Sequence, residues 1–428
     1  MTTSTRIPGV AVWLAAGGGL IQGFDTGGIS NASAAIIRHF NLPVEWQGFV
    51  TAAVLLGAMP GALAGGPLAD RIGRRGALLT CGAVFLLGVA LEVTAGGLAW
   101  LIAGRLLAGL AIGASSTVAP LYISEVSPPD KRGANLALFQ LAVVFGIVCG
   151  VLVAMAVGPE AWRVILGAGL VPGGLLLGGM ALMPESPAWH ASGVKSRSAG
   201  RAEFGRPAVE LALVVGIGMA LIQQVTGINA VMYYAPGIFE RAGFSGAGES
   251  IWDDLALALL LTVVTFLASR LVDHTGRRAL LLVGLGGMVV SFFVLGLGFS
   301  LPETFAPAKW IILAALLAFI GFFALGPGPC IWLVIAEIYP LDVRGPAMGI
   351  ATLASWLANF AVSSTFPAFS LAVGEANAFF IFGLITALSW LFTFASLPET
   401  SRRTLDEVQE IWNERAATLF KHHTIQKS

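Results

Sequence analysis

Charged residues are scarce in this sequence of 428 residues, where Asp, Glu, Lys and Arg together make up only 11%. Soluble globular proteins carry roughly 25% charged residues. An ordinary soluble domain is therefore excluded, and the 56% of hydrophobic residues predicts a membrane protein. An excess of positive charge is also absent, because Lys plus Arg and Asp plus Glu number 24 each. This balance argues against a nucleic-acid partner.

Cysteine occurs only three times, and Cys81, Cys149 and Cys330 all lie in apolar runs. They show neither a disulfide framework nor the spacing of zinc ligands. The sequence also lacks a metal-binding cluster, a paired nucleophile and base, and a nucleotide-binding loop, so we expect no enzyme activity and no cofactor. Glycine, by contrast, is abundant at 54 residues, which is typical of membrane helices that pack closely through small side chains.

Twelve apolar runs are long enough to cross a bilayer, which requires about 20 residues of helix. They lie near residues 9–30, 48–68, 77–95, 98–122, 134–157, 162–183, 210–234, 252–271, 279–300, 309–336, 346–370 and 377–396. The first run is too long for the core of a signal peptide, so we expect it to be retained. An even number of spans puts both termini on one side. That side carries 19 of the 24 Lys and Arg residues, and the positive-inside rule places it in the cytoplasm.

Three motifs that follow spans in the first half of the chain recur in the second half. "DRIGRR" (70–75) recurs as "DHTGRR" (273–278), "YISEVSPPDKRG" (122–133) as "VIAEIYPLDVRG" (334–345), and "PESP" (184–187) as "PETS" (398–401). The offsets of 203, 212 and 214 residues indicate two six-helix halves in the same orientation, as in major-facilitator transporters, whose substrate site lies between the halves. The predicted fold is therefore an all-α membrane protein with an N-terminal half (1–183), a cytoplasmic linker (184–209), a C-terminal half (210–396), and an amphipathic helix and tail (397–428).

Six motifs, in order along the chain, resemble signatures of the sugar porter family of the major facilitator superfamily. They are "GRLLAG", "PLYISEVSPPDKRG", "PESPAW", "QQVTGINAVMYYAP", "GPGPCIW" and "PETSRRTLDEV". The resemblance extends from end to end and implies a transporter related to glucose facilitators and to plant and bacterial sugar symporters. It also implies one departure, because the 26-residue linker is shorter than the family's usual one.

Amide and phenol side chains are concentrated in the seventh span: Gln223, Gln224, Asn229, Tyr233 and Tyr234. Amides both donate and accept hydrogen bonds, and aromatic rings cover the C–H faces of a sugar ring. Gly227 lies between the amides, where the helix is expected to break. The alternative is that the amides only join helices, at roughly 0.6–2 kcal/mol per bond. Three amides within seven residues exceed what one helix contact needs, which favours a substrate site.

The resemblance implies further lining residues of the sugar site. It adds Gln140 from the fifth span, Trp332, which follows two prolines expected to kink the tenth span, and Trp356 from the eleventh. The chain departs from the family pattern at four positions: Gln22 replaces an aromatic residue, Leu261 an Asn, Ser355 an Asn or Gln, and Ala324 a Glu found in some relatives. The hydroxyl-recognition pattern is therefore redistributed, and a hexose, a pentose and a polyol such as inositol all stay open.

Charged residues gather at the cytoplasmic ends of the spans. They are Asp70, Arg74, Arg75, Glu125, Arg132, Glu185, Asp273, Arg277, Arg278, Glu337, Arg344 and Glu399. One interpretation is that they only set the topology, since exposed ion pairs contribute about 0–1 kcal/mol each. The repeated spacing of seven residues from Glu to Arg favours a latch that holds the inner gate shut. The resemblance agrees, and the helix after the last span is expected to cover the inner face.

Asp25 is the only ionisable residue between Arg6 and Arg38. A charge inside the membrane is a candidate functional residue that needs a partner. Arg105 is predicted at the same depth, roughly 10 Å below the outer surface at 1.5 Å per helical residue. The pair is either a static bond between two helices or a proton-coupling site. The resemblance favours coupling, because symporters of the family carry Asp at this place and uniporters a neutral residue. Glu92, near the outer end of the third span, is a second possible carboxyl group for this role, although a position at the interface is favoured.

The leading hypothesis is a proton-coupled monosaccharide importer that works by alternating access, with a sugar, a proton and the lipid bilayer as its partners, acting as a monomer. The alternatives are a passive sugar or polyol uniporter and a non-transporting sugar sensor, which the short tail of roughly 30 residues disfavours. The Ala and Gly content favours a bacterial inner membrane. The sequon Asn31-Ala-Ser33 leaves a eukaryotic plasma membrane open.

Overall fold

The computed structural model describes residues 7–43, 46–128, 132–187, 189, 204–243, 247–302, 305, 307–340, 343–401 and 405–425, and every regular element within them is a helix. The helices of the N-terminal half are α1 (Ile7–Ala15), α2 (Gly17–His39), α3 (Trp46–Ile72), α4 (Arg74–Val93), α5 (Leu98–Val126), α6 (Arg132–Val157), α7 (Trp162–Gly167) and α8 (Leu170–Ala181). Those of the C-terminal half are α11 (Pro207–Val225), α12 (Ile228–Arg241), α13 (Ala247–Thr275), α14 (Arg277–Ser300), α15 (Ala308–Leu325), α16 (Pro327–Ile338), α17 (Arg344–Val373) and α18 (Glu375–Ser396). The last helix is α19 (Leu405–Ile425).

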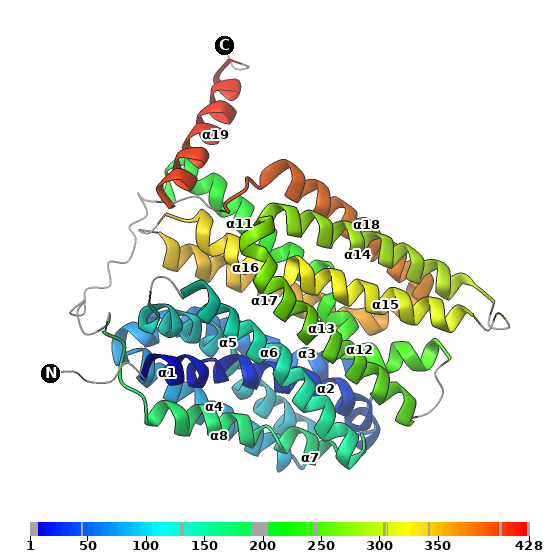
Figure 1. The fold of residues 1–428 in the computed structure, drawn as a ribbon. Coiled ribbons are helices and arrows are strands. Elements are labelled where there is room, and N and C mark those ends of the chain that lie inside the picture. The colour runs from blue at the N-terminus through cyan, green and yellow to red at the C-terminus, as the bar shows by residue number, and fades with distance from the viewer. Residues whose placement is uncertain are drawn as a thin grey trace.

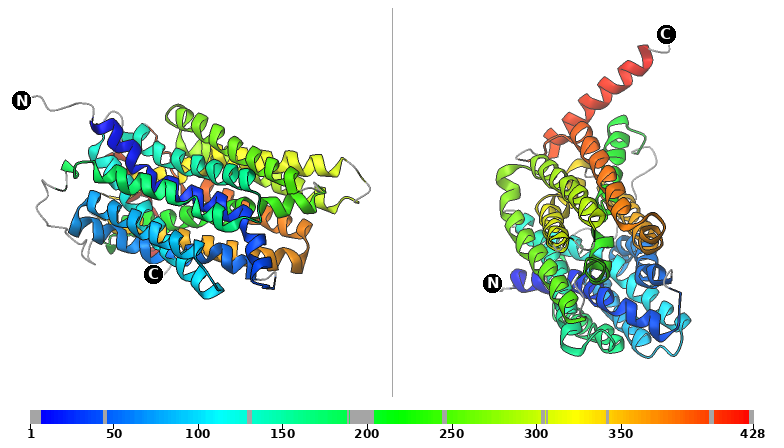
Figure 2. Two further views of the ribbon diagram at one scale, coloured as in Figure 1. Left: turned by 90° about the horizontal axis from the view of Figure 1, so that it is seen from below. Right: turned by 90° about the vertical axis from the view of Figure 1, so that its right-hand side faces the viewer.

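The helices form the two predicted six-span halves, α1–α8 and α11–α18, which lie against each other along their length (Figure 1). Figure 2 shows the same two bundles from below and from one end. Eleven of the twelve predicted spans correspond to helices, or pairs of helices, that are long and apolar enough to cross a membrane. The first span is α1 followed by α2, which continues to His39 and is less apolar because it carries Gln22, Asp25 and several small polar residues.

Two spans are interrupted where the sequence predicts a break or a kink. Between α11 and α12, Gly227 has a φ of +81°, a left-handed conformation that glycine adopts without strain. Between α15 and α16, the helix stops at Gly326 and restarts with Pro327 in its first turn, where proline is well tolerated. Backbone groups freed at such breaks are available to a ligand or to a conformational change.

Glycines let helix backbones approach each other closely. A Cβ on Gly23 of α2 would lie 1.8 Å from the carbonyl oxygen of Val143 in α6, and a Cβ on Gly109 of α5 would lie 1.8 Å from that of Val54 in α3. Neither position tolerates even a methyl group. The abundance of glycine is therefore explained by packing between helices within a half.

The halves meet through α2 with α12, α3 with α17, and α6 with α13. Near the predicted outer ends, the Ser30 hydroxyl donates a 2.9 Å hydrogen bond to the Met232 carbonyl. Gly48 lies so close to Ser364 that a Cβ would come within 2.1 Å of its carbonyl oxygen. Backbone-to-backbone contact thus joins the halves at this end.

Helix α19 buries the apolar face that its sequence predicts, with Val408 and Trp412 almost fully buried. It packs on α11 and α16 of the C-terminal half and projects away from the bundle (Figure 1). Arg415 anchors it by donating to the Ser396 carbonyl at 2.6 Å, and burial together with the nearby Arg278 lowers the pKa of this guanidinium. The helix therefore covers helix ends of one half.

Candidate functional site

Asp25 and Arg105 form a buried ion pair between α2 and α5. Arg105 donates from Nη1 to Asp25 Oδ1 at 2.6 Å and from Nη2 to Oδ2 at 3.3 Å, a two-point contact. Arg105 is fully buried and only 7% of Asp25 is exposed. Arg105 Nη2 also donates to the Thr51 carbonyl of α3 at 3.1 Å. The predicted pairing of these two residues is confirmed.

A second carboxyl group, Glu92 of α4, belongs to the same cluster. Its Oε1 lies 3.8 Å from Arg105 Nη1, and only 1% of the residue is exposed. The expectation that Glu92 lies at the interface is wrong. It fits inside because the facing residue of α5 is Gly104, where a Cβ would lie 2.7 Å from Glu92 Cγ. The close approach of α4 and α5 therefore buries the Glu92 carboxyl group, although Glu92 lies near the end of its helix.

Hydrogen bonding in this cluster is incomplete. Two buried atoms, Glu92 Oε1 and Arg105 Nε, have no hydrogen-bond partner among the described residues. Buried polar atoms are almost always satisfied, so each exception calls for an explanation. A pair that only holds two helices together would be expected to satisfy its surroundings. The unsatisfied atoms fit a site that rearranges.

The predicted amides of the seventh span form one network with α17. Gln224 Nε2 donates to Gln223 Oε1 at 3.3 Å and to the Ser355 hydroxyl at 2.9 Å. Asn229 Nδ2 donates to Gln224 Oε1 at 2.6 Å across the break at Gly227. The break allows amides from both α11 and α12 to meet, which a continuous helix would not do. These four polar side chains offer both donors and acceptors to a polyhydroxylated molecule.

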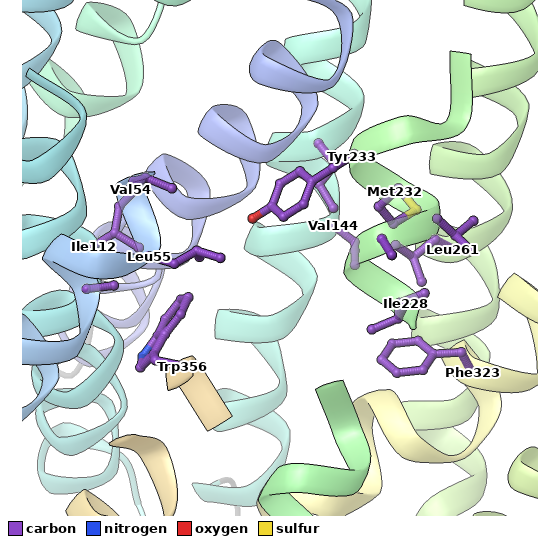
Figure 3. Packing of buried hydrophobic residues seen from close by; sticks show 14 of the residues in the cluster. Val54, Leu55, Ile112, Val144, Ile228, Met232, Tyr233, Leu261, Phe323 and Trp356 are labelled. Atoms are coloured by element: carbon purple, nitrogen blue, oxygen red, sulfur yellow. The ribbon is translucent and has the colours of Figure 1, made fainter. Parts of the chain in front are cut away.

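The two adjacent tyrosines of α12 point to different partners. Tyr233 reaches toward the N-terminal half (Figure 3), where it interacts with Asp25, Arg105 and the Thr26 side chain. Tyr234 donates to the Ser363 carbonyl at 2.8 Å and stacks on Phe366 of α17. Tyr233 therefore faces the ion pair from the helix that carries Asn229, whereas Tyr234 contacts α17 and also interacts with the Thr51 side chain of α3.

The remaining residues predicted to line the sugar site belong to several different helices. Trp356, next to Ser355, is buried beside Leu55 of α3 (Figure 3). Gln22 of α2, Gln140 of α6 and Trp332 of α16 are half-buried. No ligand contact is assigned to them by geometry, so their roles stay predictions.

The charged residues at the termini-bearing end form a cage within the N-terminal half. Arg74 donates to Glu125 Oε2 at 3.1 Å and to Asp70 Oδ1 at 3.0 Å. Glu185 accepts from the backbone N–H of Arg75 at 3.0 Å, so its carboxylate caps the first turn of α4. Ser186 donates a short hydrogen bond to Glu125.

The C-terminal half repeats this cage. Arg277 donates to Glu337 Oε1 at 3.3 Å, and Glu399 accepts from the backbone N–H groups of Arg277 and Arg278 at 3.0 and 3.1 Å. Thr400 donates to Glu337 at 2.6 Å, as Ser186 does to Glu125. The described partners of the predicted latch residues thus lie within one half. The side chains of Arg132, Asp273 and Arg344 lie outside the described part of the structure, so their latch pairs are untested.

Two hydroxyl groups of the cages were not predicted, and the burial of Glu92, a second possible carboxyl in the sequence, depends on Gly104. Ser186 and Thr400 occupy equivalent places in "PESP" and "PETS", and their shared position was the available signal. Asn31 of the sequon is buried in α2 and donates to the Gly27 carbonyl, so it is inaccessible to glycosylation. Among the described residues, no cluster of His, Cys, Asp and Glu is placed to hold a metal ion.

Comparison with known proteins extends over nearly the whole chain. The family model for "Sugar (and other) transporter" matches residues 10–206 and 194–412. The glucose transporter GlcP of Staphylococcus epidermidis is 34% identical over 432 residues, covering 94% of this chain and 96% of the relative. The galactose-proton symporter of Escherichia coli K12 is 33% identical over 429 residues, covering 93% and 92%.

The fold is similar to that of a solved transporter. The structure of the proton:xylose symporter XylE bound to 6-bromo-6-deoxy-D-glucose matches with a TM-score of 0.83 at 27% identity, covering 95% of this chain and 99% of that one. Family, relatives and fold thus agree with the duplicated helical architecture and with a multi-pass membrane protein. The chain therefore belongs to the sugar transporter family of the major facilitator superfamily.

Proposed function

We propose that this chain is a proton-coupled importer of a hexose or a pentose that works by alternating access. The observation that carries the proposal is the buried two-point pair of Asp25 and Arg105 inside the first and fourth spans. A charged pair in this place is costly and is expected to be functional. The names of related proteins, a galactose-proton symporter and a D-xylose transporter, support the same class.

Asp25 is the proton site in this proposal. As a carboxylate it is held by Arg105, which stays charged at all accessible pH values. Protonation from the outside removes the negative charge, weakens the pair and frees α2 and α5 to shift. Release of the proton on the cytoplasmic side restores the pair. A membrane potential that is negative inside adds about 2.3 kcal/mol per 100 mV to the driving force for each positive charge carried inward.

The amide network of Gln223, Gln224, Asn229 and Ser355 is the proposed sugar-binding group. It is connected to the proton site through α12, which carries Asn229 and also Tyr233, whose phenol interacts electrostatically with Asp25 and Arg105. Ser30 of α2 holds the same helix through the Met232 carbonyl. A sugar that moves α12 therefore alters the surroundings of Asp25, and the converse holds by linkage.

The test is transport by the purified full chain in proteoliposomes with an imposed pH gradient, acidic outside. Labelled D-xylose, D-glucose, D-galactose and inositol are compared. The wild type should accumulate at least one of them above equilibrium, and Asp25→Asn should lose accumulation yet keep exchange of labelled for unlabelled sugar. Glu160→Gln, which alters an exposed pair with Arg38, is the matched control and should behave as wild type.

Each other outcome rejects a part of the proposal. Equal accumulation by the wild type and Asp25→Asn rejects Asp25 as the proton site. Equilibration without accumulation identifies a uniporter. Sugar binding without any flux identifies a sensor.

A further inference from the structure

Glu92 is a buried acidic group that the proposed cycle leaves without a role. It lies in α4 with 1% of its surface exposed, and its Oε1 is 3.8 Å from Arg105 Nη1 without a hydrogen-bond partner. The same Nη1 binds Asp25 Oδ1 at 2.6 Å. Two carboxyl groups therefore share one nitrogen of one guanidinium.

The charges decide which carboxyl group holds a proton. Arg105 neutralises one carboxylate, and a second buried carboxylate would be left uncompensated. Asp25 receives two hydrogen bonds from Arg105 and is the ionised partner. Glu92 is the penultimate residue of α4 (Arg74–Val93), where the negative end of the helix dipole disfavours a carboxylate. Both arguments place the proton on Glu92 in this conformation.

Among the residues that the structure describes, the other elements packed near Glu92 supply no second ion-pair partner for it. From α7, Arg163 donates to the Ala95 carbonyl at 2.8 Å and stacks on Trp162. From α3 comes Thr51, which has no charge, and α8 (Leu170–Ala181) contains no ionisable residue. Tyr233 of α12 interacts with Asp25 and Arg105. Arg105 is thus the described cation that faces Glu92.

We propose that Glu92 and Asp25 exchange one proton across Arg105, an inference that rests on the proton-coupled function proposed above. The proton leaves the Glu92 carboxyl and binds a carboxylate oxygen of Asp25, so one O–H bond breaks and one forms. Arg105 then releases Asp25 and takes Glu92 as its counter-ion. Arg105 stays charged and the cluster stays neutral during this transfer. Asp25 can therefore be neutralised without leaving a bare guanidinium in the membrane.

The geometry suits such an exchange. The two carboxyl groups lie 2.6 Å and 3.8 Å from the same nitrogen, Arg105 Nη1, so both face one guanidinium group. The partner switch needs only a small movement of Arg105, whose Nε is free of other hydrogen bonds. Gly104 leaves space for the Glu92 side chain, and glutamine has nearly the same shape. Glu92→Gln therefore removes the exchangeable proton while preserving the packing.

The test compares Glu92→Gln and Glu92→Asp with wild type, Asp25→Asn and the surface control Glu160→Gln, using the labelled sugar that the wild type accumulates. In Glu92→Gln we expect proton-driven accumulation to fall about tenfold or more, sugar exchange to persist, and the pH dependence of uptake to flatten. Glu92→Asp keeps a carboxyl group farther from Arg105, so it should restore pH dependence with a displaced midpoint. A pH-sensitive dye reports sugar-induced proton movement independently of accumulation.

The outcomes separate this inference from the proposed function. If wild type shows no proton-driven accumulation, the proposed function fails. If wild type and Asp25→Asn behave as proposed while Glu92→Gln retains the wild-type accumulation and pH profile, proton exchange through Glu92 is overturned. Should Glu92→Gln fail to fold, a Glu92→Asp profile identical to wild type overturns it instead.

Discussion

The two halves of this duplicated molecule bury different chemistry inside the membrane. The N-terminal half holds two carboxyl groups and a guanidinium, whereas the C-terminal half holds uncharged amides and a hydroxyl. The repeat offsets place Leu295 and Leu317 where the N-terminal half has Glu92 and Arg105. Within the described part of the chain, the buried charged cluster thus lies in one half and the amide network in the other, although the scaffold is the same.

At the termini-bearing end the halves agree instead. Each half has an arginine bound to a glutamate of the fourth or tenth span. A second glutamate caps the helix that begins at this arginine. Gly73 and Gly276 precede these caps with φ of +85° and +95°. The ion pairs and helix caps at this end are therefore duplicated, whereas the buried polar groups inside the membrane differ between the halves.

The largest expected effect comes from making the N-terminal half resemble the C-terminal half. Arg105→Leu leaves Asp25 buried without a counter-ion, which should destabilise the protein by about 3–5 kcal/mol. A buried carboxyl is tolerated better when protonated, so the loss should shrink as the pH falls from roughly 8 to 5. Thermal unfolding in detergent at both pH values measures it. Asp25→Asn combined with Arg105→Leu should recover much of the stability, and a double variant as unstable as the single one would contradict the pairing energetics.

A smaller effect is expected in the amide network. Gln224→Leu removes the side chain that bonds Gln223, Ser355 and Asn229 together. Lost or unpaired hydrogen bonds of this kind cost about 1–3 kcal/mol, so sugar affinity should fall about 10- to 100-fold. Exchange measured over a range of sugar concentrations reports it. The ratio of accumulation to exchange should stay unchanged, and loss of proton coupling alone would show that the division between the halves is wrong.

The smallest effect concerns the duplicated caps. Glu185→Gln and Glu399→Gln each weaken the cap of one helix, which should cost about 0.5–2 kcal/mol. Glu185 accepts one backbone N–H of α4, from Arg75, whereas Glu399 accepts two of α14, from Arg277 and Arg278. The loss of stability should therefore be slightly larger for Glu399→Gln. Thermal unfolding of the two variants side by side provides the measurement. A marked difference in transport between them would indicate that one cage also serves as a gate.

Much of the fold is legible in the sequence, because a bilayer demands long apolar helices and a duplication repeats its motifs. The equal depths of Asp25 and Arg105 along their helices predicted that the two residues pair. Gly227, between the amides, predicted the helix break. Side-chain partners at helix ends were not predictable in the same way. The repeated spacing of seven residues from Glu to Arg indicated a latch, but it did not reveal that Glu125 binds Arg74 at the start of another helix. Glu92 is buried through Gly104, and only the crossing of α4 and α5 reveals that contact.

The break at Gly227 gives α12 the form of a lever. Asn229 lies two residues beyond the glycine and Tyr233 six, which is about 3 Å and about 9 Å along the helix axis. A rotation about the glycine therefore displaces Tyr233 about three times as far as Asn229. In the proposed cycle, a small movement of α12 at Asn229 would therefore be larger at Tyr233, on the side that faces Asp25 and Arg105 of the opposite half. Gly227, with its left-handed backbone, would be the pivot of this movement.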